Sequence, residues 1–454
     1  MMVVTRNKKG TADLHMFKYR DKQLVYDVNS GSLHEVDRPA WELIGLQRDG
    51  MTPVNSMEQL AGCYAPAVVA QAQEEIEALV AEKILFSPAP ILPDCGSGRQ
   101  LKALCLFISQ SCNLQCRYCF AHPAVEDKNV YMSRDVAFKA VNLLLEQERG
   151  RYCEIDFFGG EPLLNFPLIR DVVAYARAAG CRRGKEFTFT LTTNALLLDD
   201  EISLFLNDEN ISVILSLDGR PAVHDRMRRT ADETGSYKQA LPRIKEFLHK
   251  RNYQNYYIRG TYTVHNLDFC RDIEHLLELG FHSLSLEPVV AAEDADYALR
   301  GMDLSRLEQE YDRLVDLFLQ RRAEGRPFHF YHFAIDLENG PCLYKRLSGC
   351  GAGREYLAVA ADGSLYPCHQ FVGDDVFLLG RLGDGPLKLD LRRGEQVAHS
   401  AEEREECSGC WTRYLCGKGC AAASYFMAGD LQRNSNLYCA LQRIRLERAL
   451  YLQA

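Results

Sequence analysis

The chain has 454 residues, of which 47% are hydrophobic and 25% charged, a composition typical of globular proteins. This length exceeds one ordinary hydrophobic core, so we expect two or three domains. The net charge of −9 argues against a general nucleic-acid-binding surface. No apolar run approaches the ~20 residues that a membrane helix needs. The N-terminal residues also lack the apolar core of a signal peptide, so we expect a cytoplasmic protein that does not bind membranes.

Residues 1–95 predict a small domain of three strands followed by three helices. The strands are expected at Leu14–Tyr19, Leu24–Val28 and Leu33–Val36. Helical periodicity follows at Ala40–Leu46, Ser56–Cys63 and Ala67–Lys83. Ser56 and Gln59 have the spacing of a capping box. The proline- and glycine-rich residues 87–98 then predict a domain boundary.

Strands and helices alternate over residues 101–300. Six strands are expected at Leu104–Ile108, Glu154–Phe158, Phe187–Thr192, Val213–Leu217, Tyr257–Val264 and Ser283–Glu287. Helical stretches lie between them, so the pattern predicts an α/β fold with a parallel sheet and outer helices. Active sites of such folds lie at the C-terminal ends of the strands. A bridging helix, Asp303–Glu324, and a connector over residues 301–340 lead to a loop-rich, cysteine-dense part at 341–454.

The chain contains 17 cysteines, and most of them fall within residues 105–119 and 342–439. In a cytoplasmic protein this usage favours metal sites over disulfides. Metal–sulfur sites of this kind are sensitive to oxygen, so we expect an anaerobic or reducing setting.

Cys112, Cys116 and Cys119 follow the first predicted strand with the spacing CxxxCxxC. Three thiolates leave a cubane iron–sulfur cluster one ligand short, and the open iron can bind a small molecule. A structural zinc site is the alternative, with His122 as its fourth ligand. The spacing resembles the cluster motif of radical S-adenosylmethionine (SAM) enzymes, in which the amino and carboxylate groups of SAM chelate the open iron.

This resemblance implies a six-stranded (β/α)6 partial TIM barrel and a SAM pocket at its mouth. Gly159-Gly160-Glu161-Pro162 is similar to the turn that binds the SAM amine in that family. Glycine allows a close approach of the backbone, and a carboxylate accepts hydrogen bonds from an ammonium group.

The resemblance also assigns residues around the rest of the SAM molecule. Tyr118 is expected beside the adenine, Ser216 at the carboxylate or ribose, and Arg228 at the carboxylate. Thr193, Asn194 and Asp218 follow the third and fourth strands, where they either contact the cofactor or cap helices. An external reductant such as flavodoxin or ferredoxin would supply the electron that splits SAM into methionine and a 5′-deoxyadenosyl radical.

Seven further cysteines have a specific spacing near the C-terminus. They are Cys350, Cys368, Cys407, Cys410, Cys416, Cys420 and Cys439. The pattern resembles the SPASM domain, which binds two auxiliary 4Fe–4S clusters, and this implies three clusters in all. Zinc ribbons are the alternative, but seven ligands divide poorly into four-coordinate zinc sites.

The SPASM resemblance also implies how these cysteines divide. Cys407, Cys410, Cys416 and Cys439 would hold an outer cluster, whereas Cys350, Cys368 and Cys420 would hold an inner one. Either Cys342 is the fourth ligand of the inner cluster, or an open iron there binds a substrate thiolate. His369, which follows Cys368, would orient a cluster sulfur or lie on the surface.

Three segments, 26–37, 347–353 and 366–373, look like the maturases of SCIFF peptides. Those enzymes join a cysteine sulfur of a ribosomally made precursor peptide to a carbon, giving sactipeptide- or ranthipeptide-type thioethers. The resemblance implies that residues 1–95 form a winged-helix-like domain that binds the leader of the precursor peptide as an added strand. The alternative is a structural cap on the catalytic domain.

Two other functions compete with thioether formation. An anaerobic sulfatase maturase, which forms formylglycine, combines a radical SAM barrel with a SPASM domain but lacks a leader-binding domain, and other SPASM enzymes form carbon–carbon crosslinks. An iron–sulfur electron carrier is a non-catalytic alternative. The Gly159–Pro162 turn argues against a carrier, because a carrier does not need a pocket for the SAM amine.

Overall fold

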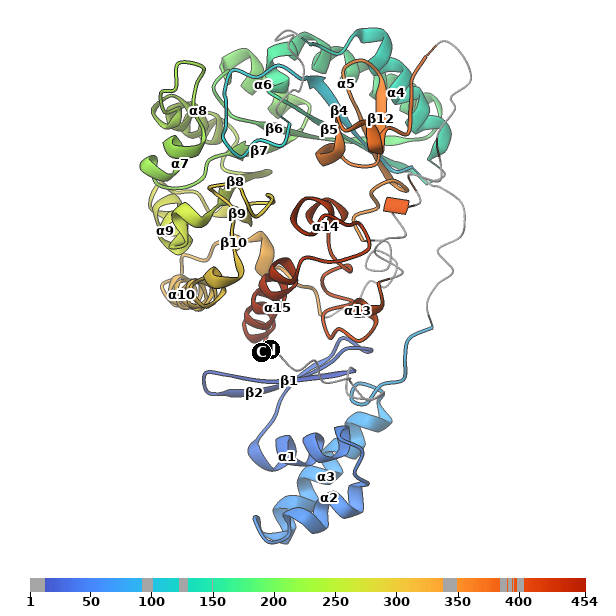
Figure 1. Ribbon diagram of the computed structural model, residues 1–454, viewed down its shortest axis with the longest axis vertical. Helices are drawn as coiled ribbons and strands as arrows, with labels where there is room; N and C mark the ends of the chain where they lie inside the picture. Colours follow the sequence, from blue (N-terminus) through green and yellow to red (C-terminus); the bar gives the residue numbers. More distant parts are fainter. Residues whose placement is uncertain are drawn as a thin grey trace.

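The computed structural model describes residues 13–91, 101–121, 130–148, 150–337, 349–383 and 404–454, together with 390, 394, 396 and 397. The small N-terminal domain lies at one end of the molecule and the large sheet with its helices at the other (Figure 1). Two C-terminal helices, α14 (Ala421–Ala428) and α15 (Asn436–Tyr451), lie between them. No helix of these described segments is long and apolar enough to cross a membrane.

The N-terminal domain has the predicted order of three strands and three helices. Its antiparallel sheet contains β1 (Leu14–Tyr19), β2 (Lys22–Asp27) and β3 (Leu33–Glu35). Its helices are α1 (Arg38–Arg48), α2 (Pro53–Leu60) and α3 (Pro66–Ala81). The capping box at Ser56 is wrong, because Thr52 caps α2 and Pro53 occupies its first turn. Ser56 instead lies inside the helix, where its hydroxyl donates to the Thr52 carbonyl at 2.9 Å.

The large sheet contains ten strands in the order β10-β9-β8-β7-β6-β5-β4-β11-β12-β13. Strands β4 to β9 follow chain order and pair in parallel, which confirms the predicted α/β fold with a mostly parallel sheet. They are β4 (Ala103–Ser109), β5 (Tyr152–Gly159), β6 (Glu186–Thr193), β7 (Ser212–Ser216), β8 (Tyr256–Tyr262) and β9 (Ser283–Pro288).

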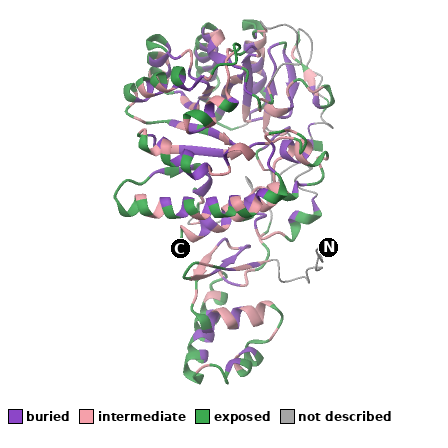
Figure 2. Cartoon of the chain, turned by 60° about the vertical axis from the view of Figure 1, so that its left-hand side comes forward, coloured by how far each residue is buried: buried purple, intermediate pink, exposed green. Residues whose placement is uncertain are grey.

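Helices connect these strands and cover the outer side of the sheet (Figure 1). They are α4 (Arg134–Gln147), α5 (Phe166–Arg182), α6 (Asp200–Asp208), α7 (Pro221–Met227), α8 (Tyr237–Lys250), α9 (Phe269–Glu278) and α10 (Leu304–Ala323). One large core lies between strands and helices; Leu104, Ile155 and Val172 are fully buried in it. Figure 2 shows the resulting pattern of buried strands and helices with exposed outer faces.

Hydrogen bonds of the large sheet cross the predicted boundary at residue 340. Strand β11 (Tyr356–Val359) pairs in parallel with β4, and β12 (Ser364–Tyr366) and β13 (Gly380–Arg381) continue the sheet. On the opposite edge, β10 (His329–Phe330) pairs with β9. The cysteine-rich C-terminal part is therefore joined to the parallel sheet by backbone hydrogen bonds.

The N-terminal sheet packs on the C-terminal part through an apolar and a polar contact. Phe17 and Tyr26 share a buried cluster with Tyr414 and Leu450. The His15 ring stacks on Trp411 with the ring centroids 3.8 Å apart. The guanidinium of the nearby Arg413 donates to Asp13 at 2.5 Å and to Asn29 at 2.9 Å.

Arg413→Ala is expected to weaken this junction, because it leaves the buried Asn29 amide oxygen without its donor. The free energy of unfolding should fall by about 1–3 kcal/mol, measured by denaturant titration. The matched control is Arg38→Ala, which removes an exposed pair with Glu42 and should leave stability unchanged. Equal effects of the two variants would contradict the structural role of Arg413.

Candidate active site

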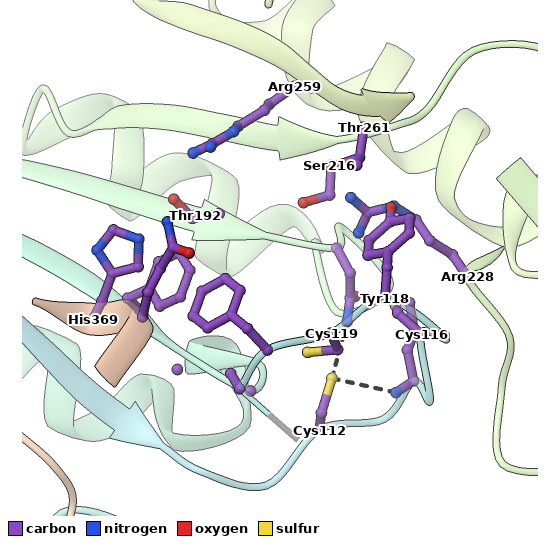
Figure 3. A pocket seen from close by; sticks show the side chains of 18 of the residues that line it. Cys112, Cys116, Tyr118, Cys119, Thr192, Ser216, Arg228, Arg259, Thr261 and His369 are labelled. Carbon is purple, nitrogen blue, oxygen red and sulfur yellow. Dashed lines mark hydrogen bonds between the residues drawn. The ribbon is translucent and has the colours of Figure 1, made fainter. Parts of the chain in front are cut away.

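The three cysteines of the CxxxCxxC motif lie in one loop after β4, at the C-terminal edge of the sheet. Cys112, Cys116 and Cys119 all line a cavity of about 440 Å³ (Figure 3). The loop is held in place by backbone hydrogen bonds from Gln115 to the Arg229 carbonyl at 2.6 Å and from Arg117 to the Met227 carbonyl at 2.8 Å.

Cys116 is buried, Cys119 is half-buried and Cys112 is exposed, and the loss of water around the thiol groups affects their chemistry. Burial raises the pKa of Cys116 to about 12, and it raises the pKa of Cys112 as well. Such thiols become thiolates when a cation replaces the proton. Within the described segments, no three His, Cys, Asp or Glu side chains are placed to share one metal ion. A cluster places each thiolate on a separate iron, so it does not require the thiols to converge on one ion.

Gly159 and Gly160 bring the end of β5 against the cysteine loop. A Cβ atom would stand 2.1 Å from the Ser109 carbonyl oxygen at Gly159 and 2.3 Å from the Ser111 carbonyl oxygen at Gly160. Gly159 also has a φ of +127°, which favours glycine. Both glycines line the cavity, as predicted, and their close backbone contact fixes where the cysteine loop begins.

Glu161 is fully buried and is not among the residues that line the cavity. Its carboxylate accepts hydrogen bonds from the Thr193 hydroxyl at 2.8 Å, the Asn194 amide at 2.8 Å and the Leu163 amide at 3.1 Å. Burial raises its pKa to about 7, although these donors act in the opposite direction. Its carboxylate thus holds the end of β6 against the end of β5.

Thr193 and Asn194 line the cavity at the end of β6 and do not cap a helix, because Asp199 is the N-cap of α6. The Asn194 side chain donates to Asn113 at 2.7 Å and lies 3.8 Å from the Cys112 sulfur. These residues therefore connect β6 to the cysteine loop.

Asp218 is also fully buried and lies behind the cavity wall. It accepts hydrogen bonds from the Tyr118 hydroxyl at 2.5 Å, from Arg228 Nε at 3.1 Å and from the Thr261 amide at 3.0 Å. Tyr118, Arg228 and Ser216 line the cavity, and the Arg228 guanidinium lies 5.5 Å from the centre of the Tyr118 ring. Asp218 therefore positions two of the residues that were predicted to contact SAM.

Sequence reasoning missed several cavity residues on β5, β6, β8 and β9 and in the cysteine loop. They are Phe120, Phe158, Thr192, Arg259, Thr261 and Glu287. A charged residue within an otherwise apolar strand was the available signal for Arg259. His369 also lines the cavity, and its ring lies 5.1 Å from Phe158 and 5.5 Å from Phe120. The C-terminal part thus closes one side of the cavity.

The seven C-terminal cysteines form two groups, with the division that the SPASM resemblance implies. The Cys368 thiol interacts electrostatically with Cys350 and Cys420. The Cys439 thiol interacts in the same way with Cys407, Cys410 and Cys416. The Asn434 side chain donates to the Cys407 sulfur at 3.2 Å, and Arg443 lies 3.7 Å from the Cys410 sulfur. Cys342, His122 and Cys95 lie outside the described residues.

Gly160→Ala is expected to disturb the site, because the added Cβ would clash with backbone atoms of Ser111. Overpacking of this kind costs about 1–3 kcal/mol, so the thermal transition and the bound iron per chain should both fall. Gly62→Ala is the control, since a Cβ at Gly62 meets no atom within 4 Å. A Gly160→Ala protein with unchanged stability and iron content would show that the close contact is not required.

Comparisons with known proteins agree with this geometry. Residues 106–273 match the family model of the radical SAM superfamily. The cysteine-type anaerobic sulfatase-maturating enzyme of Clostridium novyi is 24% identical over 366 residues, which cover 75% of this chain and 93% of the relative.

Two solved structures share the fold. Native anSMEcpe with bound AdoMet has a TM-score of 0.62 at 22% identity and covers 78% of this chain and 98% of its own. Streptococcus suis SuiB bound to S-adenosylmethionine has a TM-score of 0.51 at 14% identity and covers 94% of this chain and 98% of its own. Residues 106–273 are therefore a radical SAM domain, related to that of the anaerobic sulfatase-maturating enzymes.

Proposed function

We propose that this protein is a radical SAM maturase that forms cysteine-to-carbon thioether crosslinks in a ribosomally made precursor peptide. The observation that carries the proposal is that the inner thiol group, which contains Cys350, Cys368 and Cys420, lies next to the cavity. His369 lines the cavity, and the next residue back along the chain is Cys368 of that group. A peptide thiol in the cavity would therefore lie beside this second group of metal-binding thiols.

The residues present fit the 4Fe–4S cluster and the SAM that the superfamily uses. Cys112, Cys116 and Cys119 offer three thiols, and the glycine turn would bring backbone close to the ligand. When bound, the cluster would supply the electron that cleaves SAM. Arg228 and Ser216 would then hold polar groups of SAM, whereas Phe120 and Phe158 would exclude water from the reacting atoms.

The two C-terminal thiol groups fit two auxiliary clusters, with Cys350, Cys368 and Cys420 in one and Cys407, Cys410, Cys416 and Cys439 in the other. Crosslinking removes one hydrogen atom from the acceptor carbon, one proton from the cysteine thiol and one electron. Clusters held by the C-terminal cysteines would supply a path for this electron to an external carrier. Any open position on the inner cluster depends on Cys342, which lies outside the described residues.

The N-terminal sheet suits the recognition of a leader peptide. β3 pairs with β2 on one side through the hydrogen bonds of Ser32 with Asp27 and of Val36 with Gln23. By the antiparallel alternation, the backbone groups of Leu33 and Glu35 point to the other side. An extended peptide added there would be held by main-chain hydrogen bonds. The fold shared with SuiB covers 94% of the chain and so includes most of this domain.

Formylglycine formation is the second candidate, and the sequence similarity to a sulfatase-maturating enzyme favours it. The two reactions differ in their products. A thioether keeps the cysteine sulfur in the peptide, whereas formylglycine loses the sulfur and gains a carbonyl. Mass spectrometry therefore separates them.

The first step of the test is a search for a short cysteine-rich reading frame next to this gene, and the second is co-expression of that peptide followed by mass spectrometry. Loss of two hydrogens per crosslink is expected, and Cys112→Ala should abolish both SAM cleavage and crosslinking. Cys410→Ala should spare some SAM cleavage but block crosslinking, because it removes a thiol of the outer group. The control, Cys181→Ala, changes an exposed cysteine outside all three groups.

One outcome would overturn the thioether proposal, and another would refute only the route proposed for the electron. One is an unmodified precursor peptide together with formylglycine in the Kp18Cys peptide, which is bound in a structure of anSMEcpe. The other is full crosslinking by the Cys410→Ala variant, which would refute the assigned route of the electron.

Glu35→Pro tests the recognition role of the N-terminal sheet. Proline removes the outward N–H of an edge strand without breaking a hydrogen bond to β2. Affinity for a fluorescently labelled precursor peptide should fall about tenfold, the effect of one lost hydrogen bond of about 1.5 kcal/mol. Glu35→Ala, which removes only the side-chain pair with Lys22, should bind normally. Equal affinity of the two variants would exclude strand addition at β3.

A further inference from the structure

Arg259 is a charged residue in the middle of β8 whose side chain enters the cavity. Buried positions of this strand, such as Ile258 and Gly260, alternate with Arg259 and Thr261, which line the cavity. Figure 3 shows Arg259 pointing towards Thr192 and the side closed by His369, away from Arg228 and Cys116. The cavity therefore has two guanidinium groups in different parts of its wall.

The two arginines differ in their partners. Arg228 is paired with the buried Asp218 carboxylate at 3.1 Å. Among the residues that the structure describes, none forms a hydrogen bond or an ion pair with the Arg259 guanidinium, although its charge acts on Glu287 and His332. An arginine stays charged at any physiological pH and offers a planar set of donors that matches a carboxylate. The hydrogen-bond donors of the Arg259 guanidinium are thus open to a ligand in the cavity.

Glu287 is the one carboxylate among the described residues of the cavity wall, and other groups hold it. His332 Nε2 lies 3.0 Å from the Glu287 carboxylate, and Arg445 donates to His332 Nδ1 at 2.6 Å. Because a guanidinium cannot accept a hydrogen bond, Nδ1 is the acceptor, and the proton of the neutral ring lies on Nε2. Burial favours the neutral form of Glu287, but His332, Arg259 and Arg445 together lower its pKa to about 2.

Arg259 and Glu287 also line a second cavity of about 650 Å³. Tyr257 and Tyr331, together with serine hydroxyls of β7 and β9, line this second space. The interior of the sheet thus has room for a peptide segment beyond a SAM-sized ligand. Arg259 stands where these two spaces meet.

We propose that Arg259 binds a carboxylate of the substrate peptide and thereby selects an acidic group next to the reacting residue. The proposal rests on the proposed function, since it takes the cavity to be the substrate site. Because His332 and Arg445 hold Glu287, the guanidinium of Arg259 is left for the incoming anion. The carboxylate comes either from an aspartate or glutamate side chain or from a peptide C-terminus.

The first experiment uses small probes and does not depend on the identity of the precursor. Saturation-transfer NMR of the SAM-loaded protein compares N-acetylaspartate amide, N-acetylalanine and N-acetylasparagine amide. Binding of N-acetylaspartate amide would indicate that the site takes a side-chain carboxylate, and binding of N-acetylalanine would indicate that it takes a C-terminal carboxylate. Arg259→Gln should abolish the signal of whichever probe binds. Equal binding of the asparagine probe, no binding of either carboxylate, or binding that survives Arg259→Gln would overturn the proposal.

The second experiment uses the precursor peptide with single Asp→Asn or Glu→Gln changes, or with an amidated C-terminus. Arg259→Gln should raise the KM for the acidic peptide about tenfold to a hundredfold, the range for a lost charge-assisted hydrogen-bond pair. It should cause no further loss with the neutral peptide, and the KM for SAM should change less than twofold. Arg259→Lys should recover part of the affinity.

The control is Arg322→Gln on the exposed end of α10, which should not change either KM. A parallel rise in the KM for SAM would assign Arg259 to SAM and not to the peptide. Additive losses from Arg259→Gln and the neutral peptide would also contradict the proposal. If the wild-type protein fails to modify the precursor at all, the proposed function fails, while the NMR experiment still decides the carboxylate site.

Discussion

The close contact between the end of β5 and the cysteine loop is the constraint on which the site depends. Without side chains at Gly159 and Gly160, the loop can begin within backbone hydrogen-bonding distance of the neighbouring strand. This places three thiols at the C-terminal edge of a parallel sheet, where the ends of the other strands bring their polar residues. Backbone hydrogen bonds thus position the start of the cysteine loop, and its three thiols line the cavity, where a ligand can reach them.

Two buried carboxylates behind the cavity wall connect the ends of neighbouring strands to one another. Glu161 joins the ends of β5 and β6, and Asp218 joins β7, β8 and the cysteine loop through Tyr118. Each carboxylate accepts three hydrogen bonds, which offsets the cost of burying a charge. Glu161 and Asp218 do not line the cavity themselves, but they hold residues that do.

The motifs and the alternation of strands and helices were sufficient to predict the α/β fold, the position of the cysteine loop and part of the cavity wall. Local signals have clear limits, however. The predicted capping box at Ser56 is wrong, because α2 begins earlier, with Thr52 as its N-cap and Pro53 in its first turn. Arg259 and Glu287 were missed because a side chain that faces the interior of a sheet is recognised only once the pairing of strands is known. The pairing of β11 with β4 spans some 250 residues, and no local pattern encodes it.

The stacking of His15 on Trp411 has a geometric consequence. Trp411 lies between Cys410 and Cys416, and Arg413 of the same loop holds Asp13 and Asn29. The N-terminal domain is thus attached to the segment that carries Cys410 and Cys416, and this attachment fixes its distance from the cavity. A peptide tethered at β3 would have to bridge that span with a set number of residues. The number of residues between the bound leader and the target would then determine which residue reaches the cavity, in addition to the chemistry of its side chain.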